Sequence, residues 1–139
     1  MSQWRLSGLA SPYSHIMVGS NDIVRSKKFY DALFVAMGGQ PGVEDTRGRL
    51  AYAHNGGRFM VSKPIDGKPA SPANGGTTGF TMSDAKKAEA WHKAGVANGG
   101  TSIEDPPGVR QGAAGQMYLA YLRDPDGNKL VGVYRMPAA

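Results

Sequence analysis

The stretch Tyr121–Arg135, YLRDPDGNKLVGVYR, decides how the rest of the sequence is interpreted. It holds two runs rich in apolar and aromatic residues, separated by the pentapeptide DPDGN at residues 124–128. Asp, Pro, Gly and Asn favour turns because they either fix the backbone angles a turn needs or hydrogen-bond to the turn backbone. The stretch therefore predicts a β-hairpin with strands at residues 116–123 and 129–135.

A similar hairpin occurs earlier in the chain. RLAYAH and RFMVS, at residues 49–54 and 58–62, flank the turn residues NGG. Upstream of each hairpin lie a short strand, at residues 13–20 or 77–82, and an amphipathic helix, at residues 21–37 or 83–97. Ser20 or Asn21 is a candidate cap for the first helix, Ser83 or Asp84 for the second, and glycine pairs stop both.

The order strand–helix–strand–strand–strand thus occurs twice, with Asp22 aligned to Asp84, Phe29 to Trp91 and Tyr52 to Tyr121. We predict an α+β fold made of two βαβββ modules in a single domain over residues 1–139. Module one covers about 13–63 and module two about 76–135, and the linker of about 64–75 is rich in Pro and Gly. Because neither half buries its own sheet, the modules should pack together or exchange between chains.

Composition limits the function. The chain of 139 residues has no cysteine, which excludes disulfides, zinc ribbons, iron–sulfur sites and thiol nucleophiles. Its formal charge of +5 comes from scattered basic residues without a nucleic-acid motif, so we expect no nucleic-acid partner and a neutral or anionic small ligand. No apolar run is long enough for a membrane helix, and MSQWRLSGLASP at the start lacks the pattern of a signal peptide. We therefore expect a soluble, cytoplasmic protein without a membrane partner.

Two segments, SHIMVGSNDIVRSKKFYDAL at 14–33 and RDPDGNKLV at 123–131, make the chain similar to the vicinal oxygen chelate superfamily. That superfamily includes glyoxalase I, bleomycin resistance proteins and extradiol dioxygenases, and the resemblance covers roughly residues 13 to 135. It implies two βαβββ modules whose mixed sheet curls around a pocket, a divalent metal in that pocket, and a homodimer.

The resemblance also implies where metal ligands should lie, and this sequence departs from that pattern. His15 stands at the first position, Phe59–Met60–Val61 at the second, Thr77 or Thr78 at the third, and Val131 replaces the glutamate expected after DPDGN. A site of this kind needs about three protein ligands. We therefore predict no metal cofactor, with His15 the one surviving candidate ligand. The alternative is one divalent metal held by an unusual ligand set.

Strand alternation and the resemblance together predict an apolar pocket with a few polar tips. Its expected lining is His15, Met17, Tyr52, Met60, Thr78, Phe80, Tyr121 and Val131, with Arg110 at the mouth. Six of these residues also have a purely structural interpretation: His15, Tyr52 and Tyr121 as satisfied core residues, Met60 and Val131 as core packing, and Arg110 as a surface arginine. No residue is assigned a catalytic role.

Three functions follow from these expectations. The first is a superfamily member with a degenerate metal site that binds a neutral or anionic small molecule without metal. The second is a divalent-metal-dependent lyase or dioxygenase with an unusual ligand set. The third is a structural or interaction module that binds no ligand.

Overall fold

The computed structural model describes residues 11–138. In module one a parallel pair, β1 and β4, is extended by antiparallel strands in the order β1-β4-β3-β2. The elements are β1 (Ile16–Gly19), α2 (Ile23–Ala36), β2 (Val43–Glu44), β3 (Leu50–His54) and β4 (Gly57–Ser62). The turn between β3 and β4 is the predicted Asn55–Gly56 pair, and both residues have positive φ.

Module two repeats this arrangement with one addition. Its sheet has the order β5-β9-β8-β6, and β7 also pairs with β8. The elements are β5 (Thr78–Thr81), α3 (Ala85–Ala97), β6 (Thr101–Ser102), β7 (Gly108–Gly112), β8 (Gly115–Arg123) and β9 (Lys129–Arg135). Strand β7 was not among the predicted strands, and Gly108–Gly112 pairs with Gly115–Leu119 as a hairpin.

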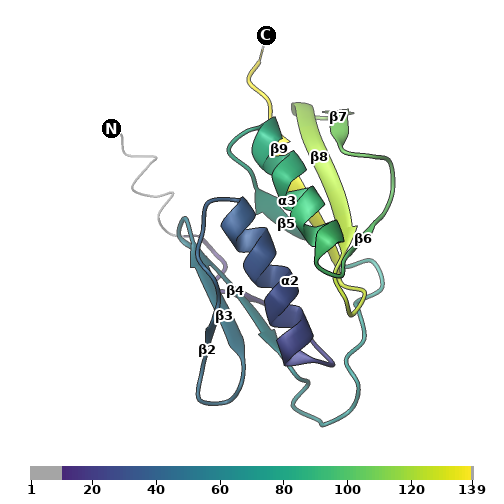
Figure 1. The fold of residues 1–139 in the computed structure, drawn as a ribbon. Coiled ribbons are helices and arrows are strands. Elements are labelled where there is room, and N and C mark those ends of the chain that lie inside the picture. The colour runs from purple at the N-terminus through teal and green to yellow at the C-terminus, as the bar shows by residue number, and fades with distance from the viewer. Residues whose placement is uncertain (1–10, 139) are drawn as a thin grey trace.

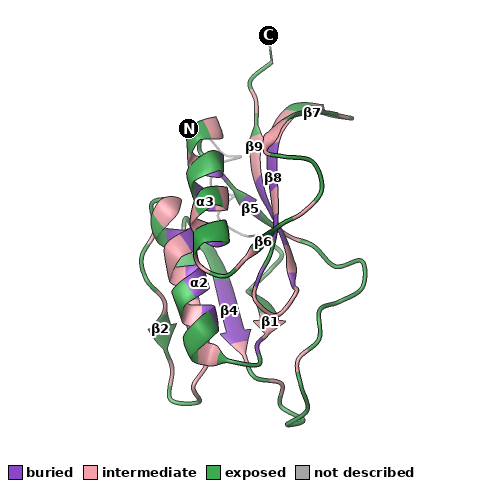
Figure 2. Cartoon of the chain, turned by 45° about the vertical axis from the view of Figure 1, so that its right-hand side comes forward, coloured by how far each residue is buried: buried purple, intermediate pink, exposed green. Residues whose placement is uncertain are grey.

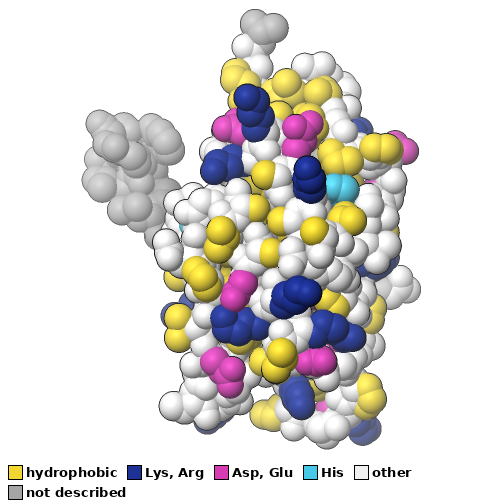
Figure 3. Space-filling view, viewed as in Figure 1, with side chains coloured by type: hydrophobic (Ala, Val, Ile, Leu, Met, Phe, Trp, Pro, Cys, Tyr) yellow, Lys and Arg dark blue, Asp and Glu magenta, His cyan; other side chains and the backbone are white. Residues whose placement is uncertain are grey.

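The modules form two sheets rather than one continuous curled sheet, and the predicted α+β class with two modules is confirmed. Figure 1 shows α2 in front of the first sheet and α3 in front of the second. On this helix side, Lys and Arg side chains are spread among Asp and Glu (Figure 3), as expected for a solvated surface. Neither described helix is long and apolar enough to cross a membrane.

Aspartates cap both helices. The side chains of Asp22 and Asp84 accept hydrogen bonds from the backbone N–H groups of Arg25 and Lys87, so the helices begin after these residues. Ser20, a predicted cap, is instead fully buried, and its Oγ lies 2.6 Å from the Ser26 Oγ.

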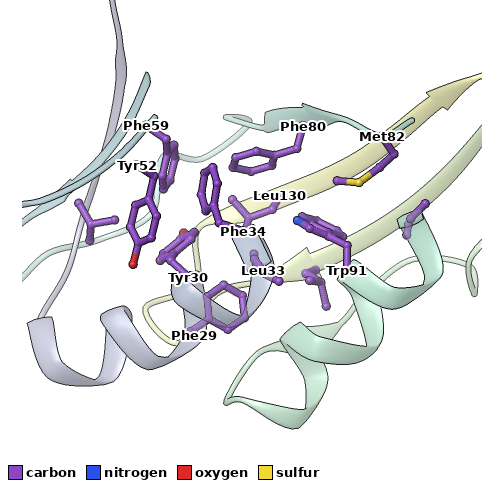
Figure 4. Close-up of a cluster of buried hydrophobic side chains, with 14 of the residues drawn as sticks. Phe29, Tyr30, Leu33, Phe34, Tyr52, Phe59, Phe80, Met82, Trp91 and Leu130 are labelled. Atoms are coloured by element: carbon purple, nitrogen blue, oxygen red, sulfur yellow. The ribbon is translucent and has the colours of Figure 1, made fainter. Parts of the chain in front are cut away.

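One core spans both modules, between the sheets and the helices (Figures 2 and 4). Phe34 of α2 stacks on Tyr52 with ring centroids 4.5 Å apart, and it meets Phe80 of module two edge to face at 5.7 Å. Such aromatic pairs contribute beyond the area they bury. The first and second modules therefore share one core.

The helices approach closely at Gly95 of α3. A Cβ added there would lie 2.4 Å from Leu122 Cδ1 and 3.1 Å from Leu33 Cδ2. Leu33 and Leu122 are both fully buried, so neither side chain has free space to move into. A Cβ at this position would require the Leu122 or Leu33 side chain to shift.

The turn at residues 124–128, here named the clamp turn, joins the two modules. Asp124 accepts hydrogen bonds from the Tyr30 hydroxyl at 2.6 Å and from its own turn, including the N–H of Asn128. Asn128 Nδ2 donates to the Gly19 carbonyl. Asp126, whose side chain is 1% exposed, accepts from Arg25 Nη2 at 2.8 Å. The clamp turn of module two is thus hydrogen-bonded to the start of α2 and the end of β1.

Candidate functional site

Strand register divides each sheet into a helix-facing side and an outer side. In module one, Met17 pairs with Met60, whereas Val18 pairs with Val61, which lies in the core beneath the helices. Alternation along a strand then places Met17, Met60 and the preceding His15 on the outer side. The structure brings these three predicted site residues to one face.

In module two, Val131 pairs with both Tyr121 and Gly79. Its neighbour Leu130 is in the core, so Val131, Tyr121 and Gly79 lie on the outer side of the second sheet. Tyr121 is half-buried, and Lys129 Nζ lies 5.1 Å from its ring centroid. Lys129 also pairs with Glu104.

Tyr52 faces the helices, so the expected pocket-facing orientation is wrong. It pairs with Phe59, is 2% exposed, and its hydroxyl donates to Asp31 Oδ1 at 2.7 Å. The position that matches Tyr121 is Ala51, because Ala51 pairs with Met60 as Tyr121 pairs with Val131. A one-residue slip in aligning the two hairpins moved the side chain to the opposite face.

The environment of Tyr52 explains its role in the core. Burial and the neighbouring Asp31 raise the pKa of the Tyr52 phenol far above its ordinary value. Burial alone would raise the pKa of Asp31, but hydrogen bonds from Lys27, the Gly42 N–H and Tyr52 outweigh it, so that pKa is lowered. The Tyr52 hydroxyl thus already donates its hydrogen bond to Asp31 within the core.

Thr78 and Phe80 also face the helices, pairing with Leu130 and Gly132. The module-two residue that matches Met17 is Gly79, again one position away from the prediction. Thr78 and Phe80 do line a hollow of about 360 Å³, but it lies between the modules rather than on the outer side. The predicted site residues therefore separate into two places.

Arg110 of β7 lies beside Met117 of β8, and its Nη2 donates to the Pro106 carbonyl at 2.8 Å. Arg110 lines neither the hollow between the modules nor the outer-face hollow described below. The structure does not bring it together with the other predicted residues.

The four positions at which the family's metal ligands are expected do not fit a metal ion. His15 is exposed, with its Nδ1 2.7 Å from Ser14 Oγ. Of the other expected positions, Met60 offers a thioether, Thr77 or Thr78 a hydroxyl group and Val131 an isopropyl group. In residues 11–138 no three His, Cys, Asp or Glu side chains lie close enough together to hold a metal. A single imidazole is a poor site for a first-row metal.

Sequence reasoning missed a basic hollow on the outer side of module one, here named the outer-face hollow. Its volume is about 640 Å³, and it lies at the end of the first sheet where β1 and β4 end and β3 begins. The residues that line it are Met17, Val18, Gly19, Arg47, Arg49, Ser62, Lys63, Pro64 and Ile65. The available signal was Arg49, which alternates with Leu50 and so shares the face of Ala51 and Met60.

Arg49 is held in place within this hollow. Its Nε donates to Asp45 Oδ2 at 2.7 Å, and its backbone N–H donates to Asp45 Oδ1. The Arg49 N–H, together with the guanidinium, lowers the pKa of the Asp45 carboxyl. Arg47 and Lys63 have no ion-pair partner among the described residues, so their charges are available to a ligand.

Comparisons with known proteins agree with this architecture. The sequence model of the glyoxalase/bleomycin resistance protein/dioxygenase superfamily matches residues 13–131. A glyoxalase/bleomycin resistance protein from Albidiferax ferrireducens T118 is 51% identical with a TM-score of 0.87, covering 90% of this chain and 100% of its own. No curated protein matches.

Two more distant structures share the fold. A family enzyme from Burkholderia phytofirmans PsJN is 17% identical, with a TM-score of 0.65 over 88% of this chain and 98% of its own. A lactoylglutathione lyase from Agrobacterium tumefaciens is 18% identical, with a TM-score of 0.60 over 90% of this chain and 95% of its own. The match over residues 13–131 and the 51% identity lead to one conclusion: this chain belongs to the glyoxalase/bleomycin resistance protein/dioxygenase superfamily.

Proposed function

We propose that this protein binds a small anionic or neutral molecule on the outer side of its sheets without a metal ion. The observation that supports this most directly is the outer-face hollow, where Arg47, Arg49 and Lys63 surround the apolar side chain of Met17. Guanidinium groups donate paired hydrogen bonds to carboxylates and phosphates, and an apolar side chain such as that of Met17 packs against the apolar part of a ligand.

The residues present favour binding over catalysis. Asp45 already orients Arg49, so less side-chain freedom is lost when an anion arrives. The outer-side residues His15, Met60, Gly79 and Val131 provide neither a metal site nor an acid–base pair. No observation favours the metal-dependent lyase or dioxygenase over binding alone.

We also propose a cytoplasmic homodimer, as the family resemblance implies. Ile65 is fully exposed, which supports coverage of this residue by another protein surface. Light scattering coupled to size exclusion should give twice the mass of the chain. A mass equal to a single chain would contradict the dimer.

Metal content is the first test of the metal-free proposal. The untagged protein is incubated with iron, manganese, cobalt, nickel and zinc, desalted, and measured by mass spectrometry. We expect near-zero occupancy, because one imidazole does not retain these ions. Occupancy near one per chain would overturn the proposal, and His15→Ala would then identify the first ligand.

Thermal stabilisation tests ligand binding, because a ligand specific for the folded state raises apparent stability. Phenyl phosphate, benzamide and benzylamine represent an anionic, a neutral and a cationic ligand with one shared ring. We expect the largest rise in Tm with phenyl phosphate. This rise should disappear in Arg47→Ala but remain in Lys68→Ala, which is a control in the linker. The proposal fails if benzylamine stabilises most, if none of the three stabilises, or if Lys68→Ala has the same effect.

A further inference from the structure

The hollow between the two modules, here named the seam, is separate from the outer-face hollow and shares no lining residue with it. Its volume of about 360 Å³ lies within the range of small-molecule sites. Four segments enclose it: the start of β1, the end of α2, the turn from β3 to β4 with the first residues of β4, and strand β5 along its whole length.

The floor of the seam is aromatic. Phe34, Phe59 and Phe80 all line it, and Figure 4 shows them grouped together from three different elements. Phe80 meets Phe34 at 5.7 Å and Phe59 at 5.3 Å between ring centroids, both edge to face. A flat aromatic ring placed here would add to a cluster whose geometry is already set.

The rim of the seam is basic. Arg58 is exposed and has no ion-pair partner among the described residues, and His54 and Asn55 lie next to it. No acidic residue lines the seam. The rim therefore favours a negatively charged group over a positive one.

One wall of the seam is the open edge of a sheet. In the described chain β5 pairs with β9 alone. Met82 N–H donates to the Val133 carbonyl, so alternation turns the N–H groups of Gly79 and Thr81 away from β9. Both residues line the seam, where these N–H groups can donate to an oxygen acceptor.

From these three features we propose that the seam binds an aromatic carboxylate. The ring lies on Phe34, Phe59 and Phe80, and the carboxylate accepts hydrogen bonds from Arg58 and from the β5 edge. This site is additional to the outer-face hollow and does not depend on a metal ion.

The probe is naphthalene-2-carboxylate, with naphthalene-2-carboxamide as the uncharged match, titrated into the full chain while the backbone amides are followed by NMR. We expect the amide signals of Gly79 and Thr81 to move. Arg58→Ala should raise the Kd of the carboxylate about tenfold, the effect of losing one charged hydrogen bond, and leave that of the carboxamide nearly unchanged. Ile16→Trp, at a half-exposed lining residue, should fill the seam and abolish binding of both.

Arg47→Ala separates this site from the outer-face hollow, because it should leave naphthalene-2-carboxylate binding unchanged. The proposal is overturned if the Gly79 and Thr81 signals do not move at millimolar probe, or if binding survives Ile16→Trp. It is also overturned if Arg47→Ala weakens binding and Arg58→Ala does not. In that last case the carboxylate lies in the outer-face hollow, and the proposed function stands while the seam site fails.

Discussion

At the scale of single residues, the Tyr118 hydroxyl donates a hydrogen bond to Glu89 Oε2 at 2.6 Å, joining β8 to α3. Burial, followed by this hydrogen bond and the charge of Glu89, raises the pKa of the Tyr118 phenol to about 12. The pKa of Tyr118 is higher in the folded than in the unfolded state, so the protonated phenol stabilises the fold. This stabilisation is complete below the ordinary pKa of about 10. It is lost as pH rises toward 12.

This gives a pH-dependent prediction. Glu89→Gln should move the pKa of Tyr118 back toward its ordinary value, since the neutral amide no longer opposes the phenolate. An NMR titration of the Tyr118 ring measures the shift directly. Glu44→Gln, at an exposed strand residue, is the control and should leave the Tyr118 titration unchanged. An unaltered Tyr118 pKa in Glu89→Gln would contradict the assigned cause.

Tyr52 and Tyr121 show which part of the candidate site could be predicted from the sequence. Both look alike in the motifs LAYA and LAYL, yet Tyr52 lies in the core and Tyr121 on the outer side. The orientation depends on strand pairing, and a one-residue difference between hairpins reverses it. His15, Met17 and Met60 alternate onto the outer side of the first sheet and Val131 onto that of the second, and their role in ligand binding stays a prediction.

At the scale of elements, the contact between the helices depends on Gly95. Gly95→Ala should gain about 1 kcal/mol of helix propensity and lose about 1–3 kcal/mol to overpacking against Leu122 and Leu33. We expect a net loss in the free energy of unfolding, measured by urea denaturation. Val96→Ala, at the exposed neighbouring position, should change stability by less than about 0.5 kcal/mol. A stabilised Gly95→Ala protein would show that the helices have room to separate.

The elements themselves were largely predictable. Both helices and both main hairpins carry strong periodicity and clear stop signals, and the structure has them within a few residues of the predicted bounds. Strand β7 was not predictable because Gly108–Gly112 contains two glycines and a single apolar residue, Val109. Pairing with β8 stabilises this strand although its own sequence has a low β-propensity, so tertiary context overrides propensity there.

At the scale of the whole molecule, the clamp turn joins the modules through Asp126. Asp126→Ala removes the acceptor of Arg25 Nη2 and of the Asn21 N–H, and should lower the free energy of unfolding by about 1–3 kcal/mol. Asp66→Ala, in the linker, is the control and should have an effect below about 0.5 kcal/mol. A double-mutant cycle with Arg25→Ala measures the coupling, and a coupling energy of zero would contradict the clamp.

Because the modules share a core, we expect Asp126→Ala to keep a single unfolding transition. Far-ultraviolet circular dichroism and tryptophan fluorescence should report the same midpoint, since Trp91 is in the shared core. Two separated midpoints would show that the modules unfold independently once Asp126 is removed.

The clamp turn also has a consequence for the order in which the protein matures during translation. Asp124 and Asp126 are synthesised after both helices, yet their partners Tyr30 and Arg25 belong to the first helix. While the ribosome is still adding module two, the hydroxyl of Tyr30 and the guanidinium of Arg25 lack their acceptors. Module one therefore completes these hydrogen bonds only after the clamp turn has left the ribosome.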